Sequence, residues 1–151
     1  MAGTPTYAAS HMGLCVADLD KSLRFYCEGL GFEAAERWEL NSDIAPGLDK
    51  ALEIDGRTEV ISQFVRNGGM AIELLWYSSH QPIGAPSQTR LQLGLTHISF
   101  YVDDVDAAVE HALAHGGTLV EGTRQQPGID LVFVQDPDGT RVELMQGPPA
   151  A

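Results

Sequence analysis

The sequence predicts an α+β fold built from two tandem copies of one β-α-β-β-β unit. The first observation is that residues 10–20 are echoed by residues 96–106, and each segment holds a small hydroxyl residue, a histidine, an alternating strand and an acidic turn. The second is that residues 69–74 are echoed by residues 139–144. Fixed offsets of this kind indicate an internal repeat. Each copy therefore opens on a histidine strand and closes on a glutamate strand.

Composition limits the class of protein. With 151 residues the chain is about one domain in size. Its formal net charge of −12 argues against nucleic acid and anionic membranes as partners, because both require a basic surface. No apolar run approaches the roughly 18 residues of a membrane span, and no signal-peptide pattern is present. The two cysteines, Cys15 and Cys27, lack a CxxC spacing, so a reducing cytoplasm is the expected location.

The first module is predicted over about 7–77. Its opening strand, 7–16, alternates in hydrophobicity. A helix follows, capped by Asp18 or Asp20 and ended by glycine, because apolar residues recur at helical spacing. Three strands are then predicted over residues 32–40, 58–65 and 70–77, the last two joined by a hairpin turn at 67–69.

The second module is predicted over about 93–147, after a linker over 78–92 that is rich in turn-forming residues. It repeats the plan, with a strand at 95–102 and a helix at about 104–115. A strand from 118 and strands at 131–135 and 140–146 follow. Residues 41–57 have no counterpart in this module, and their composition predicts a short helix or a lid-like loop. The whole chain, 1–151, is expected to be a single domain with a mainly antiparallel curved sheet.

Strand alternation predicts which face carries polar chemistry. Alternate residues of a strand share a face. Ile72 and Leu74 therefore leave Glu73 on the opposite face, and Val142 and Leu144 do the same for Glu143. The two histidines are placed similarly. Two curved sheets facing each other would gather four polar residues into one pocket: His11, Glu73, His97 and Glu143. The sequence leaves both a pocket within one chain and a pocket across a dimer open.

Two imidazoles and two carboxylates suit a divalent metal of borderline softness. Four protein ligands without a thiolate leave room for water, which is typical of a reactive rather than a closed structural site. A single histidine or glutamate in a strand has an ordinary explanation as a partly exposed residue. That explanation weakens here because the four recur as matched pairs.

At these residues the chain resembles the vicinal oxygen chelate superfamily, which includes glyoxalase I, methylmalonyl-CoA epimerase, extradiol dioxygenases and bleomycin-resistance proteins. Segments 10–32, 70–75, 96–118 and 133–145 carry the resemblance. Residues 133–144 are particularly similar to the closing segment of glyoxalase I. The resemblance implies paired modules forming an open cup around one metal site, commonly as a homodimer.

The ligand set implied by the resemblance favours one branch. Glyoxalase I of the bacterial type has His, Glu, His and Glu in the order of His11, Glu73, His97 and Glu143. Epimerases usually carry Gln where Glu73 stands, and extradiol dioxygenases use only two histidines and one glutamate. Antibiotic-binding members mostly lose the ligands, so the retention of all four argues for an enzyme.

The implied reaction is a metal-dependent lyase or isomerase reaction, a proton transfer next to a carbonyl through an enediolate on a small thiol adduct. A divalent ion (Ni, Co, Zn or Mn) would act as the Lewis acid. Either Glu143 or Glu73 would be the catalytic base. An epimerase-like enzyme, a drug-binding resistance protein and an iron-dependent dioxygenase remain alternatives.

The substrate pocket departs from glyoxalase I. That enzyme usually has an Arg where this chain has Cys15 and an Asn where it has Tyr77, both of which contact glutathione. These departures leave another thiol or acyl carrier open. Residues 44–52 are expected to shape substrate choice. The candidate pocket residues are Trp38, Trp76, Tyr77, Cys15, Tyr101 and Arg141.

Overall fold

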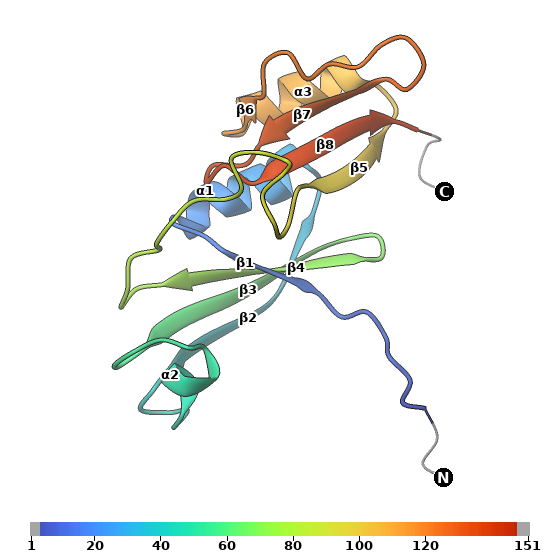
Figure 1. Ribbon diagram of the computed structural model, residues 1–151. Helices are drawn as coiled ribbons and strands as arrows, with labels where there is room; N and C mark the ends of the chain where they lie inside the picture. Colours follow the sequence, from blue (N-terminus) through green and yellow to red (C-terminus); the bar gives the residue numbers. More distant parts are fainter. Residues whose placement is uncertain (1–3, 148–151) are drawn as a thin grey trace.

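Two modules follow one another along the chain in the computed structural model, which describes residues 4–147 (Figure 1). The N-terminal module contains β1 (Met12–Cys15), α1 (Leu19–Leu23), η1 (Arg24–Gly29), β2 (Glu33–Asn41), α2 (Leu48–Ala51), β3 (Glu59–Asn67) and β4 (Met70–Tyr77). The C-terminal module contains β5 (Ile98–Val102), α3 (Val105–Ala114), β6 (Thr118–Leu119), β7 (Leu131–Gln135) and β8 (Arg141–Gln146).

The strands form two four-stranded sheets, ordered β1-β4-β3-β2 and β5-β8-β7-β6. In each sheet the first strand runs parallel to the last strand of its module, and the other neighbours are antiparallel. The α+β class and the tandem modules are therefore confirmed. The expected single cup-shaped sheet is replaced by two separate mixed sheets, because within residues 4–147 no strand pairs across the modules.

Each module begins its helix in the same way. Asp18 accepts a hydrogen bond from the Lys21 amide at 3.0 Å, and Asp104 accepts one from the Ala107 amide at 3.0 Å. These side chains satisfy amides that have no partner inside the helix. The first helix continues from α1 into η1, a π-helical turn. The cap at Asp18 resolves the choice that the sequence left open between Asp18 and Asp20.

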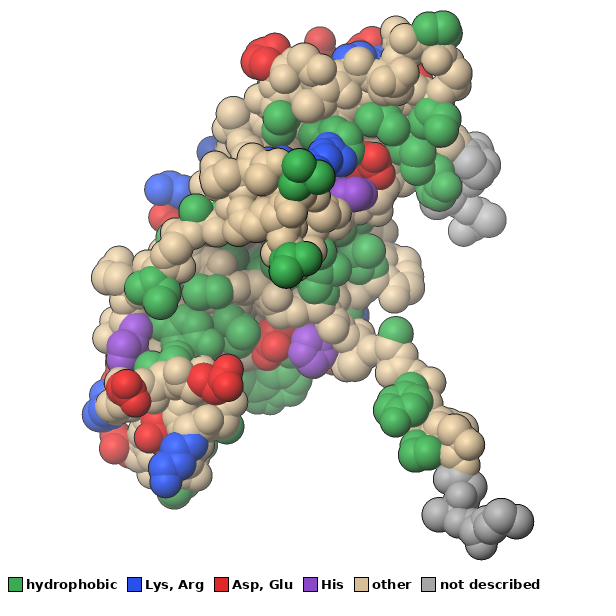
Figure 2. Space-filling view, in the orientation of Figure 1, with side chains coloured by type: hydrophobic (Ala, Val, Ile, Leu, Met, Phe, Trp, Pro, Cys, Tyr) green, Lys and Arg blue, Asp and Glu red, His purple; other side chains and the backbone are tan. Residues whose placement is uncertain are grey.

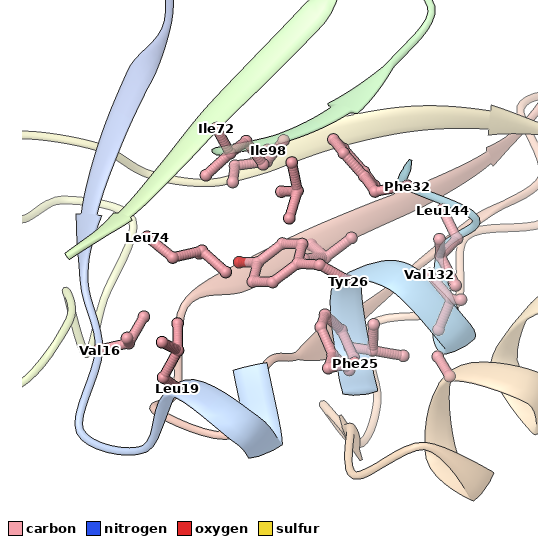
Figure 3. Packing of buried hydrophobic residues seen from close by; sticks show 14 of the residues in the cluster. Val16, Leu19, Phe25, Tyr26, Phe32, Ile72, Leu74, Ile98, Val132 and Leu144 are labelled. Carbon is pink, nitrogen blue, oxygen red and sulfur yellow. The ribbon is translucent and has the colours of Figure 1, made fainter. Parts of the chain in front are cut away.

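The hydrophobic core lies where the two modules meet. Phe25 and Tyr26 of η1 are fully buried. Figure 3 shows Tyr26 among residues of both modules, with Leu74 of β4 and Leu144 of β8 at the same cluster. Burial of large apolar side chains is the dominant stabilising term in folding. The contact between the modules is therefore part of the core and fixes one module on the other.

A buried hydrogen-bonded cluster crosses this contact. Tyr26 donates its hydroxyl to Asp136 Oδ2 at 2.9 Å, and Asp136 Oδ1 accepts the amides of Asp138 and Thr140. Burial is the largest cause that raises the pKa of the Asp136 carboxyl, and burial together with Asp136 raises the pKa of Tyr26 strongly. We call the pair of Tyr26 and Asp136 the module latch, because it joins η1 to the β7–β8 turn.

Two segments lie outside the repeated plan. The insertion over 41–57 contains α2 and an ion-pair network in which Arg57 bridges Asp43 and Glu59. The linker between β4 and β5 contains neither helix nor strand, and its Leu91 and Leu93 are 93% and 97% exposed. Over the described part of the chain, no helix has both the length and the apolar character needed to cross a membrane.

Candidate metal centre

The N-terminal half-site is built on the sheet face opposite the core. It consists of His11, Ser62, Phe64 and Glu73. His11 directly precedes β1, and its Nε2 lies 3.2 Å from Glu73 Oε2. Ser62 donates its hydroxyl to the other carboxylate oxygen, Oε1, at 2.5 Å. One Glu73 oxygen is therefore held by the protein while the other faces the imidazole.

The C-terminal half-site has the same residue types, His97, Ser99, Phe133 and Glu143, but its serine lies on β5 and not on the strand of the phenylalanine. His97 Nε2 lies 3.5 Å from Glu143 Oε2, and Ser99 donates to the same oxygen at 2.6 Å. A hydroxyl neighbours the other ring nitrogen in both half-sites: Ser10 Oγ lies 2.9 Å from His11 Nδ1, and Thr96 Oγ1 lies 2.9 Å from His97 Nδ1. Each imidazole is thus oriented with Nε2 toward its glutamate.

An aromatic ring lies beside each histidine. Phe64 is the cross-strand partner of Glu73 and meets His11 edge-on, with ring centroids 5.0 Å apart. Phe133 is the partner of Glu143 and meets His97 edge-on at 5.4 Å. A ring in this position restricts the imidazole and excludes water from one side of the His–Glu pair.

The two half-sites do not converge within one chain. No three His, Cys, Asp or Glu side chains among residues 4–147 form a group that could hold one metal ion. Figure 2 shows a histidine beside an acidic side chain on each module, at separate places. The expected single pocket of four ligands is therefore not formed by one chain, because the core holds the two sheets with their helix-facing sides together.

Each His–Glu pair nevertheless has the spacing of neighbouring metal ligands. Two donors about 2.1 Å from one metal and about 90–110° apart are about 3.0–3.4 Å from each other. The observed separations of 3.2 and 3.5 Å are close to this range. Imidazole nitrogen and carboxylate oxygen are also a donor set that divalent Zn, Ni, Co and Mn accept. The residues present therefore fit a divalent ion as two halves of a site.

Three candidate pocket residues of the N-terminal module lie on the face of Glu73. Trp38 meets Phe64 edge-on at 5.5 Å and is 48% exposed. Burial, followed by the charges of Cys15 and Glu73, raises the pKa of Tyr77, and burial raises the pKa of the Cys15 thiol. Cys15 and Tyr77 alternate in phase with the half-site on β1 and β4.

Trp76, by contrast, shares the face of Ile72 and Leu74 and packs against the core, away from Glu73.

The candidates of the C-terminal module lie on the face of Glu143. Tyr101 is in phase with Ser99 and is 65% exposed. Arg141 donates from Nη1 to the Ser87 carbonyl oxygen at 2.5 Å and also contacts the Ser87 hydroxyl. Arg141 therefore anchors the linker on β8. Residues 44–52 of the insertion remain a predicted contributor to substrate choice.

Four half-site residues were not expected from the sequence: Ser62, Phe64, Ser99 and Phe133. The sequence does indicate the two phenylalanines, because the position of each hairpin turn sets the pairing register. That register determines which residue lies opposite the glutamate. Pairing of Asn67 with Met70 places Phe64 opposite Glu73. The linker residue Arg90 was also missed, and no periodicity marks it. Its guanidinium carbon lies 3.6 Å from the centroid of the Phe133 ring.

The profile of the Glyoxalase/Bleomycin resistance protein/Dioxygenase superfamily matches residues 8–144. The chain belongs to this superfamily. A solved relative in fold is a glyoxalase family protein from Bacillus cereus, with a TM-score of 0.78 and 23% identity over 97% of this chain and 99% of that one. Its sheets and helices therefore correspond to those described above.

Sequence relatives carry several names. The Escherichia coli protein YaeR is 31% identical over 90% of this chain and 93% of its own. A probable lactoylglutathione lyase of Synechocystis is 28% identical over 90% and 92%. A 2-epi-5-epi-valiolone epimerase of Actinomyces is 30% identical over 95% and 81%. The superfamily is therefore shared with enzymes of more than one reaction.

Proposed function

We propose that this protein is a metal-dependent lyase or isomerase of the glyoxalase I kind, acting on a small thiol adduct. The observation that carries the proposal is the matched pair of half-sites, each with a His–Glu pair at metal-ligand spacing and a serine on the carboxylate. The similarity to a probable lactoylglutathione lyase supports the same reaction class.

We propose that the active molecule is a homodimer with two sites. Each site combines the N-terminal half-site of one chain with the C-terminal half-site of the other chain. Within the described residues β1 pairs only with β4, and β5 pairs only with β8. The free edges of β1 and β5 follow directly on the two histidines, so a strand edge of a second copy can bring a second His–Glu pair close. The exposed Leu91 and Leu93 supply apolar surface for the same contact.

Each group then has a role in proton transfer. A divalent ion held by the two half-sites would supply Lewis-acid chemistry at the substrate carbonyl oxygen. His11 and His97 would hold the ion through Nε2, and the hydroxyls beside Nδ1 keep both rings in this orientation. One glutamate holds the proton removed from the carbon next to the carbonyl and returns it to the neighbouring carbon. Phe64 and Phe133 keep water from the carboxylates during this step.

The test combines metal analysis and activity. Elemental analysis of the purified protein is expected to give near one equivalent of Ni, Co, Zn or Mn per site, and this metal is expected to be lost in His97→Ala. Glu143→Gln is expected to retain part of the metal and to lose the conversion of the methylglyoxal hemithioacetal. A protein that binds no divalent ion under any loading condition would contradict the proposal.

The second candidate is an epimerase acting on an acyl compound. The similarity to an enzyme named 2-epi-5-epi-valiolone epimerase favours this type of reaction, and the acyl substrate is our own expectation. Both reactions begin with proton removal next to a carbonyl, so the same half-sites serve either. Racemisation of a chiral acyl thioester with uptake of solvent deuterium, without conversion of hemithioacetals, would select the epimerase.

A further inference from the structure

The side chain that lies over Phe133 is a charged arginine that makes no ion pair with residues 4–147. Arg90 belongs to the linker, and its guanidinium carbon lies 3.6 Å from the Phe133 ring centroid. Phe133 in turn contacts His97 and pairs with Glu143. A cation therefore lies directly against the aromatic ring of the C-terminal half-site. The neighbouring contact of Arg141 with Ser87 holds the linker in this position.

Arg90 differs in this respect from the arginine beside the other phenylalanine. The Arg66 guanidinium carbon lies 5.6 Å from the Phe64 ring centroid, and its side chain is bound by both carboxylate oxygens of Glu36. Arg90 makes no side-chain hydrogen bond or ion pair with residues 4–147, and it is exposed. Arg24 and Arg141 also lack an acidic partner, but each donates to a backbone carbonyl oxygen, of Ala114 and Ser87 respectively. Among the arginines of residues 4–147, Arg90 alone therefore makes neither an ion pair nor a side-chain hydrogen bond.

A guanidinium resting on a ring keeps its N–H donors directed outward, in a fork that matches a planar oxyanion. A single arginine balances the one charge of a carboxylate, whereas a phosphate dianion would leave excess negative charge near Glu143. We propose that Arg90 binds a carboxylate of the substrate, so that the substrate is a thiol adduct or thioester bearing an acidic group. This inference rests on the proposed function for the reacting end of the molecule.

The test compares two hemithioacetals of methylglyoxal on metal-loaded protein, an anionic one formed with mercaptoacetate and a neutral one formed with 2-mercaptoethanol. The anionic adduct is expected to have a KM at least about tenfold below that of the neutral adduct, since hydrogen bonds to charged groups are worth about 1.5–3 kcal/mol. Arg90→Gln is expected to remove this difference through KM, with kcat little changed. Arg90→Lys should keep part of it, and Arg66→Gln is the matched control and should keep all of it.

A binding measurement separates this inference from the proposed reaction. Calorimetric titration with S-benzyl mercaptoacetate, which cannot react, is expected to show binding that weakens about tenfold or more in Arg90→Gln and in the ligand's neutral amide. Such binding in a protein without isomerase activity would refute the reaction and keep the carboxylate site. Equal turnover of anionic and neutral adducts, unchanged by Arg90→Gln, would overturn the carboxylate site and keep the reaction.

Discussion

In the N-terminal half-site Trp38 meets the phenylalanine edge-on, whereas in the C-terminal half-site Arg90 lies over it. Beneath these two covers the histidine, the glutamate and the phenylalanine are repeated at corresponding positions. Each carboxylate also accepts a serine hydroxyl, but from a different strand, β3 in the first module and β5 in the second. Trp38 belongs to β2, which is much longer than its counterpart β6, and Arg90 belongs to the linker, which the repeat does not match.

The comparison separates two requirements. A metal needs the same donors from each half-site, so the two modules keep the same residue types at corresponding positions. A substrate is not symmetrical, so the side chains around the donors differ. One half-site presents an aromatic surface and the other a cation, which suits a substrate with an apolar end and an acidic end.

The largest expected effect is the loss of metal affinity when either histidine is replaced. His11→Ala and His97→Ala should each lower metal affinity by more than about 100-fold, beyond the 10–100-fold typical of outer-shell partners. Elemental analysis after dialysis measures this. His80→Ala is the control, because His80 lies in the linker and bonds Ser79 and the Asp55 carbonyl oxygen. Retention of metal by one histidine variant alone would mean that the half-sites are not equivalent.

The hydrogen bond of the module latch is expected to contribute to the free energy of unfolding and to have little effect on the reaction. Tyr26→Phe removes the donor to the buried Asp136 and should lower the free energy of unfolding by about 1–3 kcal/mol. Urea unfolding measures the change, with Tyr7→Phe as control because Tyr7 is 90% exposed. An unchanged midpoint would show that the latch does not fix the modules.

The two serines offer a finer comparison. Ser62→Ala should weaken metal binding by about tenfold, because Ser62 is buried and alone holds Glu73 Oε1. Ser99→Ala should have the smaller effect, because Ser99 is exposed and water can replace its hydroxyl. Competition with a metal-binding dye gives both affinities, and a larger loss in Ser99→Ala would reverse the interpretation.

The smallest expected effect is at the aromatic cover. Trp38→Ala should raise the KM for adducts with an apolar group a few-fold, since such a ring pair adds about 0.5–1.5 kcal/mol. Steady-state kinetics with thiols of increasing apolar size measures this. Trp76→Phe is the control on the opposite face of the sheet. An equal response to both variants would remove the distinction between the faces.

Sequence periodicity predicted the parts of the molecule that depend on local pattern. The strands at 70–77 and 131–135 have the bounds that were expected, and alternation placed Glu73 opposite Ile72 and Leu74. The same alternation places Trp76 with these two apolar residues, so its distance from Glu73 could also have been derived. The opening strand is shorter than expected, because only Met12–Cys15 pairs with β4.

Other features depend on contacts that no local pattern encodes. The separation of the two sheets follows from how η1 packs between them, through buried Phe25 and Tyr26. Arg90 lies in a segment without regular structure, so neither period nor pairing register connects it with Phe133. The half-sites could be predicted from the repeat, but their separation and their different covers could not.

The most direct test of the account mixes the His11→Ala and His97→Ala proteins. Each variant keeps one intact half-site, so a site built across two chains is restored once in every mixed dimer. Random exchange makes half of the dimers mixed, with one of two sites intact, so about a quarter of wild-type metal content and activity should return. Recovery to that level is the predicted result. No recovery, with mixed dimers verified by mass spectrometry, would contradict the account.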